Sequence, residues 1–247
     1  MSGSPHPAPA VEYRCVTSGY RDGSPVVTDF SARLAPQGLV HLTGPNGAGK
    51  STVIELASGY LRPWSGTVLI AGEPAEAPRS RARRRVVRSA PALHPGLTVG
   101  EHLAFAARCQ HADLEEVRQR VAAYGLDPWW DHEARELSTG TTRKLWLLMC
   151  TTGSFDVAFL DEPCNGLDDA AIEVLLGELE DWSATRCVVL VAHQLPAGCL
   201  PDTTLRLEPV EHLMPGPLVP VGAALTPPVG GSETEDLGSR AGGGSNR

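Results

Sequence analysis

The hydrophobic pattern along the chain alternates between short apolar runs and longer segments with helical spacing. Short apolar runs favour strands, whereas apolar residues that recur every three or four positions favour helices. The predicted strands are Val11 to Val16, Val26 to Leu34, Gly38 to Thr43, Gly66 to Ile70, Asp156 to Leu160 and Cys187 to Ala192. The predicted helices are Ser51 to Ser58, Glu101 to Cys109, Leu114 to Tyr124, Ser138 to Thr151 and Ala170 to Trp182. This alternation predicts an α/β fold with a parallel sheet and helices on its faces.

The pattern also predicts how the chain is organised. The first two strands indicate an antiparallel β edge subdomain, and residues of about 90–152, mostly helical in spacing, indicate an inserted helical subdomain. Residues 1–10 are rich in Pro, Ala and Ser, and residues 211–247 are rich in Gly, Pro and Ser. Such segments bury too little apolar area to offset the entropy of ordering, so we expect both to be disordered. The folded unit is therefore predicted to span residues 11–210.

A glycine-rich loop follows the strand that ends at Thr43. It fits the pattern G-x-x-x-x-G-K-[ST] at every fixed position, with the residues Gly44, Pro45, Asn46, Gly47, Ala48, Gly49, Lys50 and Ser51. Glycines let the backbone wrap so that successive N–H groups point at a phosphate, and the following helix adds its positive dipole end. Lys50 supplies a charge between the β- and γ-phosphates, and the Ser51 hydroxyl supplies a ligand for Mg²⁺. The loop therefore predicts binding of a nucleoside triphosphate, ATP above all.

Two carboxylates, Asp161 and Glu162, end the apolar strand that begins at Asp156. An aspartate at that strand end, beside the phosphate-loop strand, can hold Mg²⁺ through water. The following glutamate can act as the general base toward an attacking water. The pair thus predicts hydrolysis as well as binding.

Composition and charge narrow the range of partners. The net charge of −8 argues against nucleic acid as the main partner, because phosphate backbones attract basic surfaces. No apolar run approaches the roughly 20 residues that span a bilayer, and we see no signal peptide at the N-terminus. Six cysteines without CxxC spacing indicate free thiols. A cluster of arginines between residues 79 and 88 is interpreted as a solvated helix face.

With these motifs in place, residues of about 11–208 resemble the ATP-binding subunit of ABC transporters. The segment Leu137 to Thr141 resembles that family's signature, most often LSGGQ, and Ser138 can also serve as the N-cap of the helix it opens. The resemblance implies that Ser138 and Gly140 contact the γ-phosphate held by a second ATP-binding subunit. It places Asp168 in the family's D-loop and Thr52 directly after the phosphate loop, and both are predicted to contribute to nucleotide binding.

The resemblance implies two further roles. His193, after a predicted strand, matches the switch histidine that senses the γ-phosphate and supports the attacking water. Tyr20 lies where the family's adenine-stacking aromatic residue is expected, and Tyr13 is the competing candidate. The predicted catalytic residues are Glu162, His193 and Lys50, and the predicted metal ligands are Ser51 and Asp161.

The sequence departs from the family pattern at two places. Thr139 and Thr141 stand where the common signature has glycine and glutamine, a variant similar to the drug, antibiotic and haem exporter branch. Ser89 stands where a glutamine of the family binds Mg²⁺ and relays movement to the membrane subunit, and serine is too short for the same reach. This substitution puts metal coordination and coupling in question at that point.

Three functions follow from the resemblance. The first is the ATPase of an export pump that works as a homodimer or heterodimer at the cytoplasmic face of the membrane, with a separate integral-membrane permease. The second is a regulatory nucleotide-binding module with weak hydrolysis, paired with an intact ATPase. The third is an ABC ATPase unconnected with transport, which the acidic charge and the lack of a second such domain disfavour.

Overall fold

The computed structural model describes residues 8–209, and the predicted tail at 211–247 lies outside them, as does most of the predicted N-terminal segment. The strands are β1 Val11–Ser18, β2 Val27–Leu34, β3 Gly38–Thr43, β4 Ser65–Ile70, β5 Glu73–Pro74, β6 Arg84–Val87, β7 Val157–Asp161, β8 Cys187–Val191 and β9 Thr203–Arg206. The α-helices are α1 Lys50–Ala57, α2 Pro78–Arg83, α3 Val99–Gln110, α4 Leu114–Ala123, α5 Thr139–Thr151 and α6 Asp169–Ser183. Two 3₁₀ turns, Asp127–Trp129 and Ala134–Glu136, join α4 to α5. No helix among these residues is long and apolar enough to cross a bilayer.

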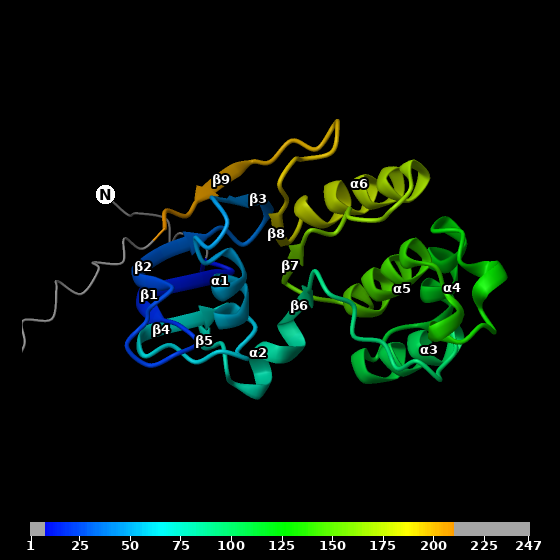
Figure 1. The fold of residues 1–247 in the computed structure, drawn as a ribbon, viewed down its shortest axis with the longest axis horizontal. Helices are drawn as coiled ribbons and strands as arrows, with labels where there is room; N and C mark the ends of the chain where they lie inside the picture. Colours follow the sequence, from blue (N-terminus) through cyan, green and yellow to red (C-terminus); the bar gives the residue numbers. More distant parts are fainter. Residues whose placement is uncertain (1–7, 210–247) are drawn as a thin grey trace, which may run out of the picture. The chain divides into compact units, whose positions relative to one another are not determined.

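The strands form two sheets, as the sequence predicts (Figure 1). Within residues 8–209, one sheet is antiparallel with the order β2-β1-β4-β5, and the other is parallel with the order β6-β7-β8-β3-β9. The parallel pairs are separated in sequence by helical segments, which is the connection that parallel strands require. The predicted α/β class with an antiparallel edge is therefore confirmed.

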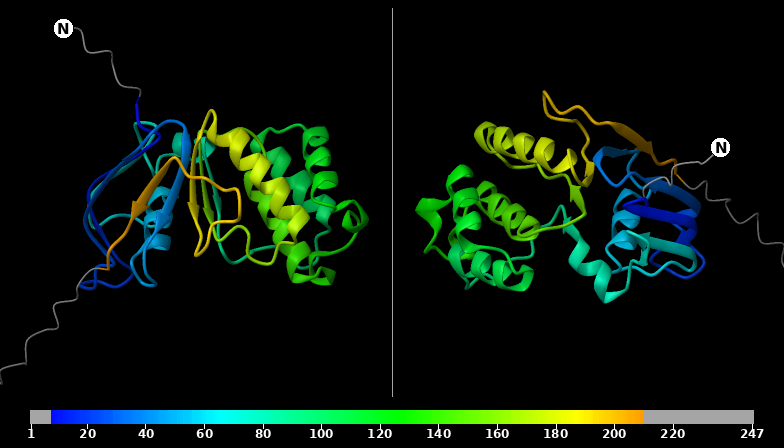
Figure 2. Two further views of the ribbon diagram at one scale, coloured as in Figure 1. Left: turned by 90° about the horizontal axis from the view of Figure 1, so that it is seen from above. Right: turned by 180° about the vertical axis from the view of Figure 1, so that it is seen from behind.

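The parallel sheet is buried on both faces because alternate residues of its central strands point in opposite directions. In β7, Val157 and Phe159 face a core that also contains α1 and the antiparallel sheet. The intervening Ala158 and Leu160 face a second core formed with α3, α4, α5 and α6. Figure 2 shows α1 on one side of the sheet and α5 and α6 on the other. The motif-bearing strand β7 is thus held rigidly from both sides.

Residues 90–152 contain helices and turns and no strand. Helix α3 begins with a capping box in which the Thr98 side chain accepts from the amide of Glu101, and Glu101 accepts in return from the amide of Thr98. Helix α5 buries Leu145, Leu147 and Leu148 in the second core. This part of the chain carries the predicted signature at the beginning of α5.

Part of the arginine cluster is placed differently from our interpretation. Arg84 and Arg85 lie in β6 and are buried, rather than on a solvated helix face. Each guanidinium donates to backbone carbonyls, including those of Ala75 and Thr152. Burial of a charged side chain is tolerated when its donors are paired in this way.

The last residue of the predicted N-terminal segment, Ala10, is buried, and its amide donates to the Leu34 carbonyl.

Candidate nucleotide site

The phosphate loop leaves the carboxyl end of β3 and leads directly into α1. Gly49 is the N-cap of α1 with φ of 93°, a left-handed conformation that favours glycine. A Cβ at this position would lie 2.8 Å from the Val27 side chain. A Cβ on Gly44 would lie 2.5 Å from the Leu207 carbonyl oxygen. Backbone conformation and space therefore both require glycine at these two fixed positions of the motif.

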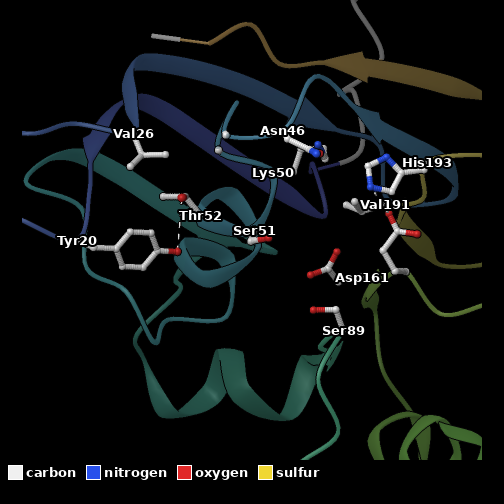
Figure 3. Close-up of a pocket in the computed structure, with 13 residues that line it drawn as sticks. Tyr20, Val26, Asn46, Lys50, Ser51, Thr52, Ser89, Asp161, Val191 and His193 are labelled. Atoms are coloured by element: carbon white, nitrogen blue, oxygen red, sulfur yellow. Dashed lines mark hydrogen bonds and ion pairs between the residues drawn. The ribbon is translucent and has the colours of Figure 1, made fainter. Parts of the chain in front are cut away.

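A cavity of about 460 Å³ opens over this loop (Figure 3). It brings together residues from five separate segments: Tyr20, Val26, Asn46, Gly47, Gly49, Lys50, Ser51, Thr52, Ser89, Asp161, Glu162, Val191 and His193. The loop supplies one wall, and the carboxyl ends of β7 and β8 supply another. Ligands of open parallel sheets bind outside the carboxyl ends of the strands, which is where this cavity lies.

The charged and hydroxyl groups of the loop and of α1 face the cavity. The Lys50 ammonium donates to the carbonyl oxygens of Gly44 at 2.7 Å and Pro45 at 3.0 Å. In Figure 3 the side chains of Ser51, Asp161 and Ser89 point toward a common space. The positive end of the α1 dipole adds to the attraction for phosphate.

Asp161 is the last residue of β7, and Glu162 follows it. Burial raises the pKa of the Asp161 carboxyl, while Arg143, the Ser89 hydroxyl and Lys50 lower it in part. Glu162 has φ of 50°, which is uncommon for a residue other than glycine. Its amide donates to the Val191 carbonyl at 2.8 Å, so the end of β8 fixes this peptide. Strained backbone of this kind concentrates at functional sites.

His193 comes two residues after β8 and lines the same cavity. Its Nε2 lies 3.7 Å from Oε1 of Glu162. The His193 side chain is mostly exposed, whereas that of Glu162 is mostly buried. The structure therefore brings together the two residues that the sequence assigns to catalysis beside Lys50.

The structure separates the two tyrosines that compete for the adenine. Tyr13 is buried in the core, where its hydroxyl donates to the Val53 carbonyl at 3.0 Å and its ring meets Phe30 edge to face. Tyr20 is 60% exposed and lines the cavity. Its hydroxyl accepts from the Thr52 hydroxyl at 3.4 Å. Of the two rings, Tyr20 is therefore the one that faces the cavity.

The signature residues Ser138 and Gly140 do not line this cavity. Ser138 is the N-cap of α5, and its hydroxyl oxygen accepts from the Thr141 amide at 3.2 Å. A Cβ on Gly140 would lie 2.8 Å from the Gly166 carbonyl oxygen, so the segment before α6 packs closely on the signature. Asp168 is also outside the cavity: it caps α6 through the Ala171 amide and pairs with Lys144 at 2.7 Å.

A buried arginine beside the site is absent from the residues predicted from the sequence, as are the lining residues Val26 and Val191. Arg143, five residues after Ser138, is buried and donates to the backbone carbonyls of Asp161 and Glu162. It also donates to the carbonyl of Ser89, the residue at the position of the missing glutamine. Its place in the middle of a helix gives no sequence signal of these contacts.

A parallel sheet with a phosphate loop after β3 and an Asp-Glu pair at the end of β7 defines a P-loop nucleoside triphosphatase. The sequence profile of the family described as ABC transporter matches residues 27–165, more than half of the chain. The chain therefore belongs to the ABC transporter family, as a member with the ATP-binding domain.

Curated relatives agree with this assignment. The cytochrome c biogenesis ATP-binding export protein CcmA of Pseudomonas fluorescens is 32% identical over 190 residues, which cover 72% of this chain and 88% of the relative. The Nod factor export ATP-binding protein I of Cupriavidus metallidurans is 31% identical over 175 residues, which cover 68% of this chain. The chain spans 58% of that relative's length and 4% of human ATP-binding cassette sub-family A member 13. The relatives also include a spermidine/putrescine import ATP-binding protein of Legionella pneumophila, 28% identical over 72% of this chain and 50% of its own length.

The fold agrees as well. A solved structure titled as the ATP-binding subunit of an ABC transporter superposes with a TM-score of 0.73 and 26% identity, over 81% of this chain and 88% of the other. The family binds and hydrolyses ATP, and the cavity over the phosphate loop is where the structure offers a site for it.

Proposed function

We propose that this chain hydrolyses ATP to power an ABC transporter that exports a drug, antibiotic, peptide or similar small molecule. The observation that carries the proposal is the meeting of Lys50, Glu162 and His193 in one cavity, with 3.7 Å between the last two side chains. A site that binds a nucleotide without hydrolysing it needs neither a general base nor a histidine beside that base. The two export relatives support export as the direction of transport, although one relative is an import protein.

In this mechanism the chain's own groups bind and orient the triphosphate. Lys50 exchanges its two carbonyl acceptors for oxygens of the β- and γ-phosphates, which are better partners because they are charged. Glu162 accepts the proton of the attacking water, and His193 holds the γ-phosphate from the other side. Tyr20 stacks on the adenine, whose flat face matches the exposed ring. Thr52 supports Tyr20 through its hydroxyl.

The donor set fits Mg²⁺. This ion prefers oxygen ligands and is commonly held by one or two carboxylates together with substrate phosphates. The Ser51 hydroxyl and the Asp161 carboxylate offer such oxygens to one space. Over the described part of the chain, no group of three or more His, Cys, Asp or Glu residues forms a complete protein cage. When bound, Mg²⁺ would neutralise charge on the phosphates.

Two ATP-binding subunits complete the site. Ser138 and Gly140 lie outside the cavity of their own chain and are free to approach the γ-phosphate held by a second subunit, either a copy or a different one. Asp168 also lies outside the cavity and pairs with Lys144 of α5, the helix that begins with the signature. A separate integral-membrane permease would dock on the helical part of the chain and hold the dimer at the cytoplasmic face of the membrane.

The substitution Glu162→Gln tests the catalytic proposal. Removal of a general base lowers turnover by about 10²- to 10⁴-fold, while ATP binding persists because the phosphate loop is intact. Turnover is measured by phosphate release and binding by calorimetry. Undiminished turnover in the variant would remove Glu162 from the mechanism.

A second candidate function, a regulatory module with weak hydrolysis, is favoured by Ser89. The residue lines the cavity beside Asp161, yet its side chain ends well before a glutamine would. The two functions differ in the ATPase rate of the unmodified chain. A rate that stays at background both alone and with its partner subunit supports the regulatory module.

A further inference from the structure

Arg143 makes an unusual set of contacts for a charged side chain in a helix. It is 3% exposed, and its guanidinium donates to four backbone carbonyls. The first two belong to the segment after β6: Nη1 lies 3.0 Å from the Arg88 oxygen and 2.7 Å from the Ser89 oxygen. The other two belong to the end of β7: Nη2 lies 3.0 Å from the Asp161 oxygen and also donates to the Glu162 oxygen.

These contacts fix the backbone of Glu162 from the side opposite to β8. The amide of Glu162 donates to Val191, and its carbonyl accepts from Arg143. The residue between these two bonds has φ of 50°. A conformation of this kind persists only where the surroundings hold it in place. The direction of the Glu162 carboxylate, and hence its distance from an attacking water, depends on that hold.

The same guanidinium also connects α5 with the segment that carries Ser89. A second cavity, of about 510 Å³, is lined by Ser89, Pro91, Leu137, Thr139, Thr142, Arg143, Asn165 and Gly166. Ser89 therefore lines both this second cavity and the nucleotide cavity, whereas Arg143 lines only the second cavity. Because the guanidinium is planar and rigid, a shift of α5 reaches Ser89 and Glu162 together.

Arg85 provides a comparison within the same chain. It is 5% exposed, and it also donates to backbone carbonyls of four residues: Ala82, Arg84, Thr152 and Ser154. None of these acceptors belongs to the nucleotide cavity. The two arginines share burial and the type of their bonds, but only Arg143 is bonded to the catalytic segment.

We propose that Arg143 is a positioning residue for Glu162 and that it ties the signature helix to the catalytic strand where the chain has Ser89. The proposal rests on the proposed role of Glu162 as the general base. Arg143 touches neither the nucleotide nor the water, and acts through the carbonyls of Asp161 and Glu162.

The test compares Arg143→Ala with the control Arg85→Ala in the full chain. For Arg143→Ala we expect kcat per folded molecule to fall about 10- to 100-fold, because a small misplacement of a catalytic group has an effect of this size. The KM for ATP should change by less than about threefold, since the phosphate loop is untouched. Arg85→Ala should lower the Tm by a similar amount and leave kcat within about twofold.

Chemical rescue separates positioning from general loss of stability. Guanidinium ion at low millimolar concentration, far below denaturing levels, can enter through the neighbouring cavity and replace the missing group. It should restore part of the kcat of Arg143→Ala and leave Arg85→Ala unchanged. If Arg143→Ala fails to fold, Arg143→Lys replaces it, because lysine keeps the charge and three donors but cannot span both pairs of carbonyls.

Hydrogen exchange gives a readout that does not depend on turnover. The amide of Glu162 should exchange at least about tenfold faster in Arg143→Ala than in the unmodified chain, and not in Arg85→Ala. Equal behaviour of the two variants in both kcat and exchange would overturn the proposal. Glu162→Gln in the same assay judges the base separately: if it retains turnover, the catalytic role fails while the exchange result still decides the positioning role.

Discussion

The phosphate-loop cavity and the beginning of α5 differ in how complete each one is within a single chain. The cavity gathers Lys50, Asp161 and Glu162 because the parallel strands β3 and β7 end at the same edge of the sheet, although β8 lies between them and they are not adjacent as the sequence predicts. Ser138 and Gly140 lie on the helical part of the chain, outside that cavity. Within their own chain, Ser138 only caps α5 and Gly140 only packs closely against Gly166. The sheet topology thus builds the nucleotide cavity within one chain, whereas the proposed role of the signature requires a second subunit.

The largest expected effects on turnover come from substitutions that disable one region at a time, either the cavity or the signature. Lys50→Ala should weaken ATP binding by roughly 10- to 100-fold, since a hydrogen bond to a charged group is lost, and abolish turnover. Ser138→Asp should abolish turnover but leave ATP binding within about twofold, because the new charge repels only a phosphate held by the partner. Aspartate caps a helix as well as serine does, so α5 stays intact.

Ser138→Asn is the matched control for Ser138→Asp, because asparagine also caps the helix but adds no charge. It should retain measurable turnover. Calorimetry reports binding and phosphate release reports turnover. Loss of ATP binding in Ser138→Asp alone would mean that the signature contributes to the cavity of its own chain, against the separation of the two regions.

A smaller effect is expected at the edge of the cavity. Tyr20→Ala should raise the Kd for ATP about tenfold, in keeping with the roughly 1–3 kcal/mol of aromatic stacking on a base. Tyr20→Phe keeps the ring and loses only the hydroxyl that accepts from Thr52, so its Kd should stay within about twofold. Titration of binding checks both variants. Equal weakening by the two substitutions would show that the hydroxyl, rather than the ring, is what matters.

Much of the fold was readable because its patterns are local. The strand at Gly38–Thr43 matches the prediction residue for residue, and β7 and β8 match within one residue at each end. Strand β6 was missed because it begins with two arginines, whose burial depends on carbonyls from distant segments. Strand β9 was missed because Thr203–Arg206 is short, largely exposed and lies at the edge of the sheet.

The site shows the same limit. The loop at Gly44 and the pair at Asp161 follow patterns that chemistry fixes in sequence, so they were predicted. The choice of Tyr20 over Tyr13 needed the structure, because both tyrosines precede the loop and only burial distinguishes them. Arg143 could not be predicted, since its four acceptors come from two segments far apart in sequence, one after β6 and one at the end of β7.

The most direct test of the shared site is to mix two inactive variants, Lys50→Ala and Ser138→Asp. In a mixed dimer, the intact phosphate loop of one chain faces the intact Ser138 of the other, so one of the two sites is whole. Random pairing of a head-to-tail homodimer then predicts recovery of up to about a quarter of the unmodified turnover. Turnover that stays at the level of either variant alone would contradict a site shared between two copies of this chain.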